Sequence, residues 1–126
     1  MKKLSSLLLI VPFLFAISSA TAHDAEPAIS TMAEIIEHLQ HYPATSEKEV
    51  LQHIIDDTHA TEGERTLARA LINMQHQVIG DDAAALKALK ENPKAPANER
   101  ELADILLGIA HMPSASDQQR LKKLAP

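Results

Sequence analysis

Apolar residues recur at every third or fourth position in six segments of the chain, and proline or glycine separates most of these segments. In residues 64–76, for example, Leu67, Leu71 and Met74 follow helical spacing, which places them on one face of a helix. The breakers between segments are Pro43, Gly80, Pro93, Pro96 and Pro113. The pattern predicts an all-α protein of six helices.

Capping residues indicate where these helices begin. In a capping box, an oxygen side chain accepts a hydrogen bond from the helix backbone, and an acid or amide three positions later reaches back. The pairs with this spacing are Thr31 and Glu34, Ser46 and Glu49, Thr61 and Glu64, Asn98 and Glu101, and Ser116 and Gln119. Asp81, which follows Gly80, is the simpler cap expected for the fourth helix.

The helices repeat in pairs with a period of 35 residues. Residues 64–76 (ERTLARALINMQH) align without a gap with residues 99–111 (ERELADILLGIAH). The same offset aligns Leu51, Leu86 and Leu121 in the second helices of the pairs. We therefore expect one domain of three tandem helical hairpins, at about residues 27–60, 61–95 and 96–126, stacked as an α-solenoid.

Two stretches of the repeat carry a family resemblance. Residues 72–89 contain a Gly80-Asp81 turn followed by the small Ala85, and residues 107–111 (LGIAH) occupy the corresponding place in the third unit. These stretches resemble the tetratricopeptide (TPR-like) repeat family. In that family the first helices line a groove that holds a peptide or partner protein. The resemblance therefore implies a protein–protein interaction module, such as an adaptor or assembly factor.

The groove implied by this resemblance is formed by apolar positions of the first helices. Its residues here would be Met32, Ile35, Leu39, Tyr42, Leu67, Ala70, Met74, Gln77, Leu102, Ile105, Ile109 and Met112. Aliphatic and methionine side chains suit adaptable recognition. Apolar residues at helical spacing also form cores, so a buried core is the alternative for the same positions.

The N-terminus has the pattern of a secretory signal peptide. Lys2 and Lys3 precede the apolar run 7–17, and Ala20-Thr21-Ala22 is a small-x-small cleavage triplet. Cleavage after Ala22 would leave a mature domain of residues 23–126. The run is shorter than the ~20 residues of a membrane-spanning helix. We therefore expect a periplasmic protein without a membrane span.

Composition narrows the range of functions. The chain has no cysteine, and Tyr42 is the only aromatic residue of the mature part. Residues 23–64 hold ten acidic side chains and one basic one, Lys48. Single-stranded nucleic acid is bound by aromatic stacking and positive charge, so we expect no nucleic-acid partner.

Histidines recur with the repeat. His41, His76 and His111 occupy equivalent positions, but stacked helices lie about 8–10 Å apart. Zinc requires each nitrogen at about 2.1 Å. We therefore expect these three histidines to fill repeat contacts rather than to share one metal ion.

A metal-binding or pH-responsive protein is the first alternative function. His38 and His41 lie three residues apart, His53 lies close to Asp56 and Asp57, and His23 would begin the mature chain. Each gives only a two-ligand fragment. The net charge is −5 for the full chain, and it is two units lower for the mature chain, which lacks Lys2 and Lys3. Protonation of all seven histidines in mild acid would bring the net charge of the mature chain to about zero.

Self-association is the second alternative, because an open array leaves two uncovered ends. The acidic first unit and the basic Arg120, Lys122 and Lys123 would attract head to tail. Catalysis is not expected, since the chain lacks a cysteine nucleophile and a glycine-rich phosphate loop. We also expect no cofactor.

Overall fold

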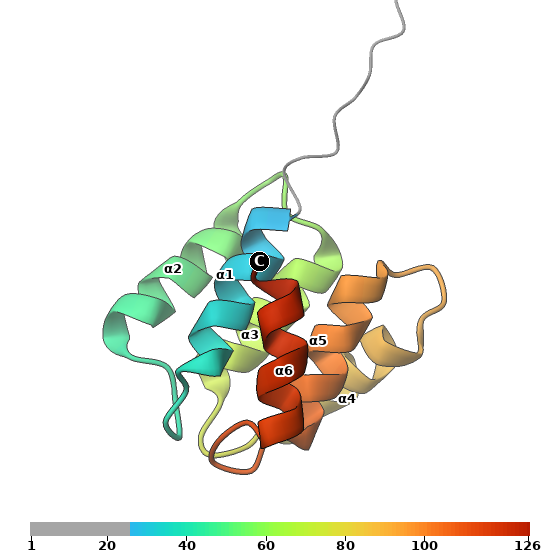
Figure 1. The fold of residues 1–126 in the computed structure, drawn as a ribbon. Helices are drawn as coiled ribbons and strands as arrows, with labels where there is room; N and C mark the ends of the chain where they lie inside the picture. The colour runs from blue at the N-terminus through green and yellow to red at the C-terminus, as the bar shows by residue number, and fades with distance from the viewer. Residues whose placement is uncertain (1–25) are drawn as a thin grey trace, which may run out of the picture.

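The structure, a computed structural model, describes residues 26–126, and this part of the chain contains six α-helices and no strand (Figure 1). The helices are α1 (Glu26–Glu37), α2 (Thr45–Asp56), α3 (Glu62–Asn73), α4 (Gly80–Glu91), α5 (Ala97–Gly108) and α6 (Ala115–Leu124). The predicted all-α class and number of helices are confirmed. The predicted signal peptide and His23 lie outside the described residues.

Helices α1, α3 and α5 supply most of the hydrophobic core. Each of them contacts the other two, and each buries residues on more than one side of the helix. The buried apolar residues of these helices are Ile29, Met32, Ala33, Ile35 and Ile36, then Leu67, Ala68, Ala70 and Leu71, then Leu102, Ala103, Ile105 and Leu106. The three helices therefore surround a common axis, with α2, α4 and α6 outside them.

Each outer helix buries one leucine completely. These residues are Leu51 in α2, Leu86 in α4 and Leu121 in α6, and they are the three positions that the 35-residue offset aligns. Burying a leucine side chain contributes about 1.5–3 kcal/mol. A leucine at the same position of each repeat therefore packs each outer helix against the core.

The three repeats close into a ring. α2 packs on α3 and α4 on α5, and in the same way the last helix, α6, packs on the first, α1. The side-chain amide of Gln118 in α6 also donates a hydrogen bond to the backbone carbonyl of Glu37 in α1 (3.0 Å). The expected α-solenoid would leave α1 and α6 far apart as uncovered ends. Closure instead buries the several apolar sides of the inner helices around one axis.

Ion pairs reinforce the last part of the ring. The guanidinium of Arg120 in α6 contacts the carboxylates of Glu101 (2.5 Å) and Asp104 (2.6 Å) in α5. The ammonium of Lys90 in α4 contacts Asp104 as well (2.7 Å). Hydrogen bonds from Lys90 and then from Arg120 lower the pKa of Asp104. Helices α4, α5 and α6 are therefore linked through one carboxylate.

One of the observed helix starts agrees with the start predicted from the sequence, and the others differ from it. Thr61 and Glu64 form the predicted capping box of α3. The starts predicted at Ser46 and Ser116 are two residues too late, because Ala44 and Ser114, each directly after a proline, are the N-caps of α2 and α6. The start predicted at Thr31 is also wrong, since Thr31 lies inside α1.

Two further cap predictions are wrong. The N-cap of α5 is Pro96 rather than Asn98, and α4 begins at Gly80 rather than after Asp81.

Within the described residues, none of the helices has the length and apolar character needed to cross a membrane.

Candidate metal centre

Each inner helix is followed by a short loop with a histidine in an unusual backbone conformation. The φ angles are 72° at His41, 66° at His76 and 75° at His111. In two of the loops a hydrogen bond spans the histidine, from the N–H of Tyr42 to the carbonyl of Gln40 (2.9 Å) and from Gln77 to Gln75 (2.8 Å).

Three-residue turns with a positive φ at the centre are rare and strained. A non-glycine residue at positive φ costs of order 1 kcal/mol or more, and such strain concentrates at functional sites. A strained positive φ therefore occurs once in every repeat, each time at a histidine.

The backbones of the three histidines form a closed cycle of hydrogen bonds. The N–H of His41 donates to the carbonyl of His111 (3.1 Å), His76 donates to His41 (2.9 Å), and His111 donates to His76 (2.7 Å). Each histidine thus gives one bond and accepts one. The cycle fixes the three loops relative to one another on the axis of the ring.

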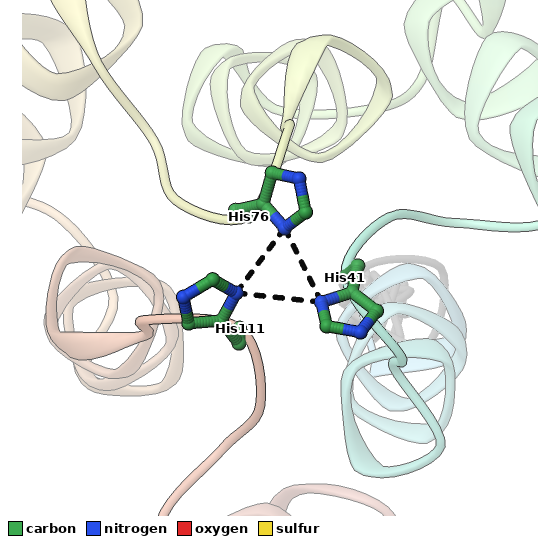
Figure 2. A group of neighbouring side chains, drawn as sticks. All are labelled: His41, His76 and His111. Carbon is green, nitrogen blue, oxygen red and sulfur yellow. Dashed lines mark hydrogen bonds between the residues drawn. The ribbon is translucent and has the colours of Figure 1, made fainter.

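This cycle brings the three imidazole rings together (Figure 2). The Nδ1 atom of His76 lies 3.2 Å from that of His41 and 3.2 Å from that of His111, and the third separation is 3.4 Å. The rings meet edge to face, with centroids 5.0–5.4 Å apart. In Figure 2 the three Nδ1 atoms point toward one central position.

The separations match a tetrahedral metal ion. With Nδ1 atoms 3.2–3.4 Å apart, an ion about 2.0–2.1 Å from each has N–metal–N angles of about 100–115°. Zinc–histidine bonds have this length, and tetrahedral geometry is the one zinc prefers. Magnesium and calcium are bound by oxygen ligands instead, so the donor set favours a transition metal.

Hydrogen bonding between the rings cannot satisfy all three nitrogens. A neutral imidazole carries one N–H, and a proton on Nδ1 would point into the space between the three Nδ1 atoms. That space has room for one proton at most. At least two lone pairs therefore converge on the centre, an arrangement that a bound cation stabilises.

The helix ends also favour a cation at this position. α1, α3 and α5 all end within four residues of their histidines, so their C-termini lie at the same end of the ring. A helix C-terminus carries about half a negative charge. All three imidazoles are exposed, so an ion can reach them from solvent.

The expectation that His41, His76 and His111 lie too far apart to share one ion is wrong. It assumed hairpins stacked in a line, which would keep equivalent residues about 8–10 Å apart. Ring closure instead turns equivalent positions toward one axis. The sequence carries the signal as three histidines at a constant offset, but a constant offset alone does not show that His76 and His111 meet His41 on one axis.

The two-ligand fragments do not assemble into a second site within residues 26–126. His41, His76 and His111 are the one group of three or more His, Cys, Asp or Glu ligands that the structure brings together there. His38 is bonded to the carbonyl of Glu34 in its own helix (3.0 Å). His53 lies on α2, beside a separate pocket between α1 and α2. His23 lies outside the described residues.

Most of the residues of the predicted groove belong to the core. Met32, Ile35, Leu39, Leu67, Ala70, Met74, Leu102, Ile105 and Ile109 are buried. Tyr42, Gln77 and Met112 are exposed, and each directly follows one of the three histidines. The structure therefore leaves these three positions accessible, next to the histidine cluster.

The opposite end of the axis holds two buried carboxyl groups. Glu64 is fully buried and Glu99 is 3 % exposed, and they lie at equivalent positions of the repeat. The hydroxyl of Thr61 donates to Glu99 (2.5 Å), while the second oxygen of Glu64, Oε1, has no partner among the described residues. Burial, and then the neighbouring Glu99, raise the pKa of Glu64.

Comparison with protein families, with curated proteins and with solved structures finds no match for this chain.

Proposed function

We propose that this chain is an exported protein that binds one transition-metal ion, of the zinc type, between His41, His76 and His111. The observation that supports this proposal most directly is the set of three Nδ1–Nδ1 separations of 3.2, 3.2 and 3.4 Å, because these separations suit tetrahedral coordination. Export is supported by the signal-peptide pattern of residues 1–22.

Preorganisation supports the same proposal. The imidazoles come from three repeats, and the cycle of backbone bonds among their own N–H and carbonyl groups holds the three residues next to one another. A site held in this way loses little conformational entropy when the ion binds. The strained φ angles are the cost of that positioning.

Isothermal titration of the tag-free protein with zinc tests the proposal. We expect one ion per chain, and a loss of affinity of more than about 100-fold in His41→Ala, His76→Ala and His111→Ala. Residues that only orient a ligand are worth 10–100-fold, so loss of a ligand should exceed this range. His38→Ala and His53→Ala are matched controls and should bind zinc like the parent. Equal affinity in all five variants would refute the site.

A protein-binding function at the same end of the ring is a second candidate. Tyr42 and Met112 are 59 % and 58 % exposed, and with Gln77 they border the histidine cluster. Capture of a periplasmic protein by the parent, and its loss in Tyr42→Ser with Met112→Ser, would support this function. Capture that is unchanged in the double variant would exclude these residues.

A further inference from the structure

The histidine cluster supplies three ligands and leaves a fourth position open. Within residues 26–126, no further His, Cys, Asp or Glu ligand belongs to the group, and all three imidazoles are exposed. Metal sites with three protein ligands retain an exchangeable water or substrate at the fourth position, whereas structural sites are closed by four. Three neutral imidazoles also leave the two positive charges of the ion without a carboxylate ligand.

A pocket lies beside one of the three ligands, His76. It has a volume of about 440 Å³, and His76 itself forms part of its wall, together with Tyr42 from the neighbouring loop and Lys48 from α2. Lys48 makes no ion pair with any residue in the part of the chain that the structure describes. The pocket therefore combines an unpaired ammonium with a metal ligand.

The lysine of this pocket is specific to one of the three interfaces of the ring. At the offset of 35 residues, Lys48 corresponds to Ala83 and Gln118. Alanine has no charge, and the amide of Gln118 is bonded to the carbonyl of Glu37. Of the three equivalent residues, only Lys48 carries a positive charge. An anion bound to the metal ion would therefore be attracted toward the interface that holds Lys48.

We infer that the metal-loaded site binds an organic carboxylate, with one carboxylate oxygen at the open position of the ion and the other part of the molecule in the Lys48 pocket. This inference rests on the proposed metal site. The rest of the wall includes Ile72, Met74 and Tyr42 beside the polar Asn73 and Gln75, so it offers apolar as well as polar surface to an organic group. Inorganic phosphate has no apolar part to place there.

Cobalt(II) replaces zinc in tetrahedral sites and makes them visible, so the test uses cobalt-loaded protein titrated with acetate, propionate and phosphate. We expect saturable changes in the cobalt absorption bands, with propionate at least as tight as acetate and phosphate weaker. Lys48→Met should weaken propionate about 5- to 10-fold and leave cobalt affinity unchanged. Lys94→Met, outside the pocket, is the matched control.

The outcomes separate the inference from the proposed function. If cobalt gives no tetrahedral bands, the metal site itself is wrong. If the bands form but do not respond to carboxylates, or respond equally in Lys48→Met and the parent, the carboxylate site is wrong and the metal site stands. Tighter binding of phosphate than of propionate would overturn the organic class of ligand.

Discussion

The backbone N–H of His41 donates a hydrogen bond to the carbonyl of His111, a residue 70 positions further along the chain (3.1 Å). This bond joins the first repeat to the last. The histidine cluster therefore exists only because the three repeats close into a ring, and the stability of the closure can be tested apart from metal binding.

Leu121→Ala tests the closure, since Leu121 is the fully buried residue of α6. We expect the free energy of unfolding in urea to fall by about 2–5 kcal/mol, as much as for the equivalent Leu86→Ala in the middle of the chain. Val50→Ala, at a position 41 % exposed, is the control and should cost less than about 1 kcal/mol. A negligible effect of Leu121→Ala, with early separate melting of α6, would indicate an open array.

His76→Gly and His76→Ala test the backbone strain. His76 has a φ of 66°, a conformation that glycine adopts freely and alanine does not. Without metal, we expect the glycine variant to be more stable than the alanine variant by about 1 kcal/mol, measured by thermal or urea unfolding. An alanine variant of equal or greater stability would show that the turn is not strained.

Glu64→Gln tests the buried carboxyl at the other end of the axis. Burial raises the pKa of Glu64 above its ordinary value, so its contribution to stability is complete below the pKa of the unfolded chain. That contribution is lost as the pH rises through the folded pKa. Glutamine keeps the shape and the capping acceptor but cannot ionise.

We therefore expect the free energy of unfolding of Glu64→Gln to decline less between pH 5 and pH 8 than that of the parent, with pH titration of urea midpoints as the measurement. The exposed Glu62, in the same helical turn, provides the control variant Glu62→Gln. Parallel pH profiles for the parent and Glu64→Gln would contradict the assignment.

Gly63→Ala tests the packing around Glu99. A Cβ at Gly63 would lie 1.9 Å from Oε2 of Glu99, so Glu99 would have to turn away and lose its bond from Thr61. We expect a loss of about 1–3 kcal/mol in the free energy of unfolding, and a smaller loss when Gly63→Ala is made in a Glu99→Ala background. Gly108→Ala, where no atom lies within 4 Å, should be neutral or stabilising by up to about 1 kcal/mol. Equal costs at the two glycines would contradict this packing.

Much of the fold could be predicted from the sequence, because periodicity reports local structure. The six helices, and the equivalence of Leu51, Leu86 and Leu121, follow from helical spacing and from a constant offset. The closure could not be read in the same way. It depends on how much each helix pair rotates relative to the next, and no single residue encodes that angle.

The candidate site could be predicted only in part. The sequence singled out His41, His76 and His111 as equivalent, but not that equivalent residues meet on an axis. The positive φ angles at these residues were also unforeseen, since neither glycine nor asparagine marks the turns. Both features follow from ring geometry, which local patterns do not determine.

Anomalous diffraction from crystals of the zinc-loaded protein, recorded at the zinc absorption edge, tests the central claim most directly. The account predicts one strong peak about 2.0–2.1 Å from Nδ1 of each of His41, His76 and His111, with a non-protein ligand at the fourth position. A zinc peak elsewhere, or an empty cluster in which the three imidazoles have moved apart, would contradict it.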